Sequence, residues 1–349
     1  MSETETHQAV ALNTAAPALS LSAVQALVAE RYGMTDTVVQ PLASERDQNC
    51  CIETPTGTRF VLKISNPAEA KAIIDFQIAA LEHIAEVAPA LPIPRVVRTS
   101  AGKKCDIVTL PAGSTTLVRM LSWLEGTQVR DTQPTPAQRR AMACCLGRLD
   151  LALQGFSHPA ARHDLLWNVS AAHRLMDKLE AVIDPARRRL AEKFMMRFTT
   201  QVLPRLGSLR AQVIHNDYHL YNVLVAPDAQ DRLTGIIDFG DMIYAPLVGE
   251  VATAAAFQMT GCDDPFAGAA QFVGAYHKTL PLTDLEQALV TDLMATRHLI
   301  TVLITEWRAA RYPHNRAYIM RHNPAAWEAL SMLADLTRDT ACDRLLAEL

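Results

Sequence analysis

Residues 213–241 read VIHNDYHLYNVLVAPDAQDRLTGIIDFGD, and this stretch decides the fold that we expect for the chain. Two mostly apolar runs, 222–225 and 235–237, flank a turn-prone segment at 226–234. Apolar runs separated by Pro, Asp and Thr residues are typical of a β-hairpin. The stretch therefore predicts a short strand, a polar loop and a hairpin in succession.

Polar side chains lie at defined positions of this predicted unit. Pairing the far ends of the hairpin sets Asn222 across from Asp238. An amide oxygen and a carboxylate oxygen are ligands that Mg²⁺ accepts. Asp217 lies on the loop that enters the hairpin, where a carboxylate could take the proton of a hydroxyl group. Together these groups are those that phosphoryl transfer requires, and a surface hairpin with a capping Asp is the alternative.

The segment from His215 to Asn222 resembles the catalytic loop H-G-D-x-H-x-x-N of the aminoglycoside phosphotransferase/choline kinase-like family. Asn216 stands where that family usually has Gly. The string IIDFGD at 236–241 resembles the D-F-G motif of kinases. The resemblance implies a catalytic base at Asp217, Mg²⁺ ligands at Asn222 and Asp238, and loop-supporting histidines at His215 and His219.

That family implies an α+β, bilobal protein-kinase-like fold, with a small antiparallel-sheet N-lobe that contains one key helix and a larger, mainly helical C-lobe. We expect a disordered tail at 1–18, a nucleotide-binding lobe at 19–121, and a catalytic and acceptor-binding lobe at 122–349. Periodicity predicts strands at 42–51, 58–64, 105–110 and 116–121. It predicts helices at 20–33, 67–86, 135–155, 170–182, 185–207, 247–259, 265–279, 283–310 and 324–346.

Lys63 lies in the predicted strand 58–64, where Leu62 and Ile64 share one face and Lys63 points to the other. A strand lysine in contact with water is the ordinary interpretation of such a residue, and a phosphate partner is the alternative. The resemblance implies the phosphate, because kinases hold nucleotide phosphates with a strand lysine. Family members often pair this lysine with a helix Glu, and the residues available for that place here are Gln77 and Asp75.

The turn 43–49 lies where kinases place a phosphate-covering loop, and it contains no glycine. Its side chains Ser44 and Asn49 are the donors that we expect for phosphate. The string MLSWLEG resembles the hinge of the family, whose backbone meets the purine, so Met120 and Ser122 complete the expected nucleotide site. No G-x-x-x-x-G-K-[ST] or G-x-G-x-x-G motif occurs, which argues against a P-loop or Rossmann site.

The segment after the D-F-G string is short, and it leads directly to an apolar stretch at 251–257. A protein kinase needs a long activation segment there to dock a polypeptide, so we expect a small-molecule acceptor. The similarity is closest to hydroxylysine kinase and its bacterial relatives, with the shared strings DQN (47–49), VLKISN (61–66), WN (167–168), GIIDFGDM (235–242) and EVA (250–252). It implies transfer from ATP or GTP to a hydroxyl of a small amino acid or amino alcohol.

An amino-acid acceptor carries an ammonium group and a carboxylate. We expect Asp241 and Glu250 to bind the ammonium group, and Arg297 to bind the carboxylate as a guanidinium fork. A structural salt bridge remains the alternative for Arg297. Trp167 is the expected wall of this site, although a lone Trp is more often a core residue.

The composition limits the possible partners. A net charge of −4 at pH 7 argues against a nucleic-acid-binding surface, which is usually basic. The N-terminus lacks the basic and apolar parts of a secretory signal, and apolar runs such as 299–304 are too short to span a bilayer. Seven cysteines without a C-x-x-C motif fit reduced thiols. We therefore expect a cytoplasmic protein without a nucleic-acid or membrane partner.

Two rival functions remain open. The first is another acceptor of the same fold, such as homoserine, choline, ethanolamine or an aminoglycoside. The second is a nucleotide-binding pseudokinase with a regulatory role. The glycine-free turn and Gln77 favour the pseudokinase, whereas an intact set of kinase residues opposes it: Lys63, Asp217, Asn222 and Asp238.

Overall fold

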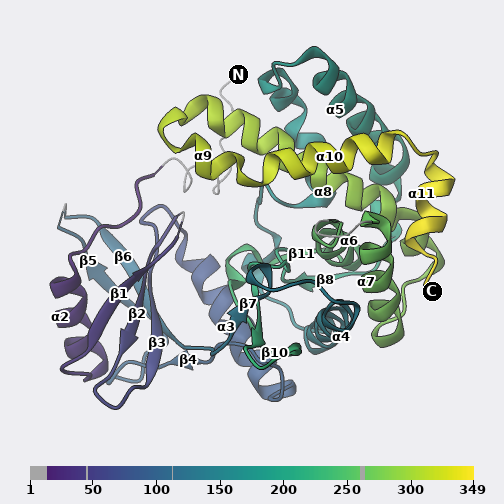
Figure 1. Cartoon of the computed structure of the whole chain (residues 1–349). Helices are drawn as coiled ribbons and strands as arrows, with labels where there is room; N and C mark the ends of the chain where they lie inside the picture. Colours follow the sequence, from purple (N-terminus) through teal and green to yellow (C-terminus); the bar gives the residue numbers. More distant parts are fainter. Residues whose placement is uncertain (1–13, 45, 112, 260–263) are drawn as a thin grey trace. The chain divides into compact units, whose positions relative to one another are not determined.

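The computed structural model describes residues 14–44, 46–111, 113–259 and 264–349 (Figure 1). They form two compact units. The first unit extends to Glu125 and also contains His158–Leu165; the second contains Gly126–Ser157 and Leu166–Leu349. Most of the expected tail at 1–18 lies outside the described residues. The boundary at Glu125 falls after the expected position at residue 121, and the return of His158–Leu165 to the first unit has no signal in the sequence.

The first unit contains an antiparallel sheet. Its strand order is β1 (Val38–Leu42), β2 (Gln48–Glu53), β3 (Arg59–Ile64), β6 (Thr115–Ser122) and β4 (Val96–Val97), and β5 (Asp106–Thr109) pairs with β6. The expectation of one strand at 42–51 is wrong. A turn divides it into β1 and β2, and within this turn the backbone N–H of Asp47 donates to Oγ of Ser44 at 3.2 Å. Such a side-chain bond offers the backbone an alternative to the strand ladder.

Two helices pack on the two faces of this sheet. The helix α2 (Leu21–Tyr32) has Ser20 as its N-cap and Gly33, with a φ of 67°, as its C-cap, so the prediction for 20–33 is confirmed. Its apolar side chains pack against one face of the sheet, which includes Leu62 and Met120. The helix α3 (Lys71–Val87) packs against the other face through Ile74, Ile78 and Leu117. Alternation along β3 and β6 therefore places Lys63 and Arg119 on the α3 face.

The second unit contains two small β structures. The strand β8 (Ala211–Ile214) pairs with β11 (Ile243–Pro246), and β9 (Val223–Ala226) forms a hairpin with β10 (Ala229–Ile236). The short strand β7 (Thr127–Gln128) joins β9 on its other side. The loop with Asp217 leaves β8 and enters β9, and the D-F-G string follows β10. The catalytic motif thus lies at the ends of three short strands.

Helices make up the rest of the second unit: α4 (Pro136–Ala152), α5 (Pro185–Arg197), α6 (Leu247–Phe257), α7 (Pro265–Thr279), α8 (Asp284–Arg311), α9 (Arg316–Ile319), α10 (Asn323–Ala334) and α11 (Arg338–Leu345). Three helix predictions need correction. The segment Val169–Ala181 is 3₁₀-helical. The helix expected at 185–207 ends at Arg197 and continues as a π turn and a 3₁₀ turn that contains Pro204. The helix expected at 324–346 is divided, because Thr337 caps a new helix.

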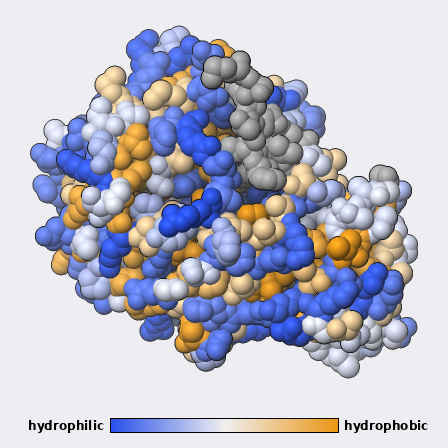
Figure 2. Space-filling model, turned by 180° about the vertical axis from the view of Figure 1, so that it is seen from behind, coloured by the Kyte–Doolittle hydropathy of each residue, from blue (hydrophilic) through white to orange (hydrophobic). Residues whose placement is uncertain are grey.

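The helix α8 forms the centre of the second unit and contacts α6, α10 and the segment Val169–Ala181. By length and composition α8 could cross a membrane, but 94% of its most apolar window is buried inside the protein. This is the environment of a core helix. On the face shown in Figure 2, apolar residues form small separate patches among hydrophilic ones.

Candidate active site

The catalytic loop begins with an unusual backbone conformation. Asn216, which replaces the family's Gly, has a φ of 66°. Asn is one of the few side chains that accept this left-handed region, so the replacement keeps the loop's geometry. The backbone N–H of Asn216 donates to Oε2 of Glu250 on α6 at 2.8 Å. A buried carboxylate on a central helix thus fixes the start of the loop.

Two histidines hydrogen-bond within the loop. Nδ1 of His215 accepts from the backbone N–H of Asp217 at 3.3 Å, so Nε2 carries the proton and donates to the carbonyl of Ile237 at 3.1 Å. Burial lowers the pKa of His215 and keeps the ring neutral. Nδ1 of His219 accepts from the backbone N–H of Tyr221 at 3.2 Å, which turns Nε2 toward Asp217. Each ring therefore has one tautomer set by the backbone.

Asp217 is surrounded by hydrogen-bond donors. Oδ2 accepts from Nδ2 of Asn222 at 2.9 Å, and Oδ1 lies 3.3 Å from both Nε2 of His219 and Nη2 of Arg297. Burial alone would raise the pKa of Asp217, but His219 and Arg297 outweigh it and hold the pKa well below its usual range. The residue is therefore a carboxylate at neutral pH and can accept a proton.

The hairpin places Asn222 and the D-F-G string side by side, with a shifted register. The backbone N–H of Ile237 donates to the carbonyl of Asn222 at 2.9 Å, so Asn222 pairs with Ile237 and the expected pairing with Asp238 is wrong by one residue. A regular hairpin continued from the Ala226–Ala229 pair would place Asn222 opposite Leu233, and the irregularities in β10 move its partner to Ile237. Asp238 comes next, with a φ of 62°, at the turn out of the hairpin.

The residues present fit a divalent cation that also binds phosphate. Nδ2 of Asn222 donates to both the carbonyl and Oδ2 of Asp217, which leaves its Oδ1 for another ligand. The carboxylate of Asp238 is near enough to His215 to act on its charge. Among the described residues, no three His, Cys, Asp or Glu side chains form a group that could hold a metal by themselves. One amide and one carboxylate oxygen suit Mg²⁺, which usually completes its coordination with water and phosphate.

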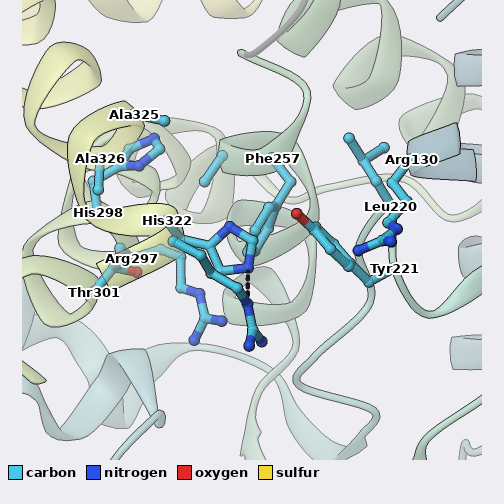
Figure 3. Close-up of a pocket in the computed structure, with 12 residues that line it drawn as sticks. Arg130, Leu220, Tyr221, Phe257, Arg297, His298, Thr301, His322, Ala325 and Ala326 are labelled. Carbon is cyan, nitrogen blue, oxygen red and sulfur yellow. Dashed lines mark hydrogen bonds between the residues drawn. The ribbon is translucent and has the colours of Figure 1, made fainter. Parts of the chain in front are cut away.

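A cavity of about 310 Å³ opens beside the catalytic loop, entirely within the second unit (Figure 3). The loop residues Leu220 and Tyr221 line it, together with side chains from α6, α8 and α10. Figure 3 shows Phe257, Tyr221, His322 and Arg297 gathered around this space. Because Arg297 also contacts Asp217, the cavity adjoins the expected catalytic base.

The structure brings together three of the four residues expected to bind the acceptor. Arg297 lies over the ring of Trp167, with 4.9 Å from Cζ to the ring centroid, and the charge of Asp241 acts on Arg297. Burial lowers the pKa of Arg297, and the nearby carboxylates oppose this effect. The expectation for Glu250 is wrong, because its side chain is fully buried and is bonded to the loop backbone. An interior carboxylate on α6 cannot meet an incoming ammonium group.

In the first unit, polar side chains form a row across the sheet. Asn49, Lys63 and Arg119 are direct cross-strand partners on β2, β3 and β6. Oδ1 of Asn49 is buried without a hydrogen-bond partner among the described residues. Arg119 donates to Oε1 of Gln77 on α3 at 2.7 Å, whereas Asp75 forms an ion pair with Lys71. Gln77 thus faces the sheet as expected, and the suggested role of Asp75 as partner of Lys63 stays a prediction.

The other residues expected at the nucleotide site differ in their exposure and in their hydrogen bonds. Ser44 is exposed on the turn between β1 and β2. Ser122 accepts from the backbone N–H of Arg95 through its Oγ at 2.8 Å, and its own N–H donates to the carbonyl of Arg95. Met120 lies in β6 between β3 and β4, and its side chain is in the core under α2. The expected contact of the Met120 backbone with the purine stays a prediction.

Several residues of the cavity have no motif in the sequence. The guanidinium carbons of Arg130 and Arg321 are 4.7 and 6.0 Å from the ring centroid of Tyr221. Nε of Arg321 donates to Nε2 of His322 at 2.9 Å. Arg119 is a further unexpected residue. Its alternation with Val118 and Met120 marks the face that it occupies, but not its contact with Gln77.

Known proteins resemble this chain in sequence and in fold. The model of the phosphotransferase enzyme family matches residues 38–286. A hydroxylysine kinase from Mus musculus is 26% identical over 345 residues, covering 93% of this chain and 91% of the mouse protein. A microcompartment-associated aminopropanol kinase superposes with a TM-score of 0.74 at 16% identity, covering 93% of this chain and 100% of that chain.

An amicoumacin kinase solved with AMP-PNP and Ca²⁺ superposes with a TM-score of 0.66 at 15% identity, covering 87% of this chain and 93% of that chain. These structures have the protein-kinase-like fold that the catalytic loop predicts, and the expected α+β class is confirmed. The resemblance to the aminoglycoside phosphotransferase and hydroxylysine kinase group is confirmed as well. The chain therefore belongs to the phosphotransferase enzyme family, and it is a small-molecule kinase whose acceptor is an alcohol group.

Proposed function

We propose that this kinase transfers the γ-phosphoryl group of ATP or GTP to the side-chain hydroxyl of a small amino acid, with 5-hydroxylysine as the first acceptor to test. The alignment with curated hydroxylysine kinases over nearly the whole chain supports this acceptor. We place the reaction in the cytoplasm, where the donor nucleotides are abundant.

The geometry of Asp217 carries the proposal. Its carboxylate is ionised, is oriented by Asn222 and His219, and adjoins a cavity large enough for a small amino acid. In the proposed reaction, the acceptor hydroxyl oxygen forms a bond to the γ-phosphorus while the bond from that phosphorus to the β,γ-bridging oxygen breaks. The hydroxyl proton passes to Asp217, and the nucleoside diphosphate leaves.

The remaining residues bind and position the donor in this proposal. Asn222 and Asp238 hold Mg²⁺, which when bound neutralises charge on the β- and γ-phosphates. Lys63 provides a positive charge for the phosphates from the first unit, and Arg119 and Asn49 extend the polar row on the same face. The amicoumacin kinase solved with AMP-PNP and Ca²⁺ supports a nucleotide with a divalent cation in this fold. Ser44 and Ser122 complete the proposed nucleotide site.

A donor-by-acceptor activity matrix tests the proposal. ATP and GTP are combined with 5-hydroxylysine, homoserine, choline, ethanolamine, 1-aminopropan-2-ol and kanamycin, and the release of nucleoside diphosphate is measured with and without Mg²⁺. We expect the highest kcat/KM with 5-hydroxylysine. A higher value for another acceptor would reassign the substrate. Nucleotide binding without transfer to any acceptor would favour the pseudokinase.

A further inference from the structure

We propose that Arg297 binds the carboxylate of the acceptor and thereby determines whether the catalytic base, Asp217, is available to the acceptor hydroxyl. In this proposal, the carboxylate binds the guanidinium group inside the cavity, and Arg297 then releases Oδ1 of Asp217 to the acceptor hydroxyl. The inference rests on the proposed function and deepens it, because it names the group that the acceptor must carry and the residue that recognises it.

The cavity is suited to an anion by its charge. Three arginines line it, Arg130, Arg297 and Arg321, and none of the described residues that line it is an Asp or Glu. Burial and the neighbouring arginines lower the pKa of His322 to about 4, so this ring is neutral and accepts the hydrogen bond from Arg321. The lining therefore presents positive charge to a negatively charged group, while Asp217, Asp241 and Glu250 lie behind it, near enough to act on Arg297.

Arg297 lines the cavity and has N–H groups without a hydrogen-bond partner. The residue is 5% exposed, and its Nε and Nη1 are buried from solvent and have no hydrogen-bond partner among the described residues. Its planar faces lie over Trp167 and Phe257, at 4.9 and 5.6 Å from Cζ to the ring centroids. Such contacts satisfy the charge but not the in-plane N–H groups. Buried N–H groups without acceptors are unfavourable, and a carboxylate matches a guanidinium with two parallel hydrogen bonds.

The third nitrogen of Arg297, Nη2, donates to the expected catalytic base, Asp217. Nη2 lies 3.3 Å from Oδ1 of Asp217, which also receives Nε2 of His219, while Asn222 donates to Oδ2 at 2.9 Å. An acceptor hydroxyl that bonds to Oδ1 must therefore displace one of these two donors, because this oxygen has only two lone pairs. Arg297 is the donor that a carboxylate in the cavity would attract, whereas His219 and Asn222 are held by the loop itself.

The consequence concerns turnover as well as affinity. An amino alcohol without a carboxylate leaves Arg297 on Asp217, so it should react slowly even when it saturates the site. A free amino acid should have a higher kcat and a lower KM than the matching amino alcohol. Polycationic aminoglycosides should bind poorly, because they meet three arginines.

The test compares 5-hydroxylysine with 1,5-diaminopentan-2-ol, which lacks only the carboxylate. Wild type, Arg297→Met, Arg297→Lys and the control Arg311→Met are assayed for kcat and KM; Arg311 is exposed at the end of the same helix, outside the cavity. We expect wild type and the control to prefer the amino acid by roughly 10- to 100-fold in kcat/KM, partly through kcat. The preference should nearly vanish in Arg297→Met and be intermediate in Arg297→Lys.

Calorimetric binding of L-lysine and cadaverine provides a readout that needs no phosphoryl transfer. These compounds lack the hydroxyl and differ only in the carboxylate. Tighter binding of lysine to wild type and to Arg311→Met, with no difference in Arg297→Met and a smaller difference in Arg297→Lys, supports the inference. Equal or absent binding of both compounds to wild type, or a preference that persists without Arg297, overturns it. Failure of the proposed function is a separate result, because it would be seen as no transfer to amino acids in the activity matrix.

Discussion

Glu250 accepts a hydrogen bond from the backbone N–H of Asn216 at 2.8 Å, so a side chain buried in α6 determines where the catalytic loop begins. Burial raises the pKa of Glu250 to about 7, although the N–H groups of Asn216 and His215 oppose this rise. The ordinary value is 4.5, so the native state binds this proton more tightly than the unfolded chain does.

This difference predicts how stability depends on pH. The contribution of Glu250 to the free energy of unfolding should fall as the pH rises from about 4.5 to about 7 and then level off. Glu250→Gln resembles the protonated form, so its stability relative to wild type should increase across that range by on the order of 1–3 kcal/mol. Urea denaturation at several pH values measures this, with the exposed Glu192→Gln as a control. A constant difference between Glu250→Gln and wild type would contradict the prediction.

Substitutions of Asn216 test the backbone conformation of the loop. Its φ is 66°, and both its side-chain Nδ2 and Oδ1 are buried without partners among the described residues. Asn216→Gly should be at least as stable as wild type, since Gly adopts this φ freely and leaves no unpaired polar atom. Asn216→Ala should be less stable than Asn216→Gly by about 1–2 kcal/mol. Thermal and chemical denaturation provide the comparison, and an Ala variant as stable as the Gly variant would refute the assignment.

Asp217→Asn separates catalysis from nucleotide binding. Asn keeps the size of the side chain but cannot take a proton, so kcat should fall by roughly 10²- to 10⁴-fold. The Kd for nucleotide should change little, because Asp217 is expected to contact the acceptor. Steady-state kinetics and calorimetry measure the two quantities. Equal losses in both would argue against the role of base.

Asp238→Ala tests the proposed metal site. The Kd for ATP or GTP is measured with and without Mg²⁺ for wild type and for the variant. We expect wild type to bind more tightly with Mg²⁺ and the variant to lose most of that gain, because a carboxylate ligand is removed. If the gain from Mg²⁺ is unchanged, Asp238 is not a metal ligand.

Arg119 and Gln77 form a buried pair whose members depend on each other. Their hydrogen bond is 2.7 Å long, and both residues are buried. Arg119→Leu should lower the free energy of unfolding by about 1–3 kcal/mol, because a buried amide oxygen loses its donor. The double variant Arg119→Leu/Gln77→Leu should recover part of this loss. Denaturation of both variants decides the point, and strictly additive effects would mean that the two side chains are not coupled.

Much of this molecule follows from local signals in the sequence. The helix α2 begins and ends as predicted because Ser20 and Gly33 are both present as caps. The capping box of Thr283 and Glu286 similarly fixes the start of α8. The catalytic loop is predictable because its residues lie within one short stretch, where spacing alone brings them together.

Other features depend on contacts between distant segments. The sequence shows Glu250 close to the D-F-G string, but not that α6 is buried on all sides. The cavity joins α8 and α10 to the catalytic loop, and no pattern marks Arg321 or His322. The pairing of Asn222 with Ile237 depends on irregular pairing in β10, which a regular hairpin model cannot anticipate.

The row formed by Asn49, Lys63 and Arg119 exists only in one alignment of β2, β3 and β6. A shift of β3 by one residue would point Lys63 into the apolar core beneath α2. It would bring Leu62 or Ile64 to the α3 face of the sheet. The proposed donor site in the first unit therefore requires the correct strand register. Mutations that weaken the pairing of these strands should therefore weaken the binding of the donor nucleotide without changing any residue of the catalytic loop.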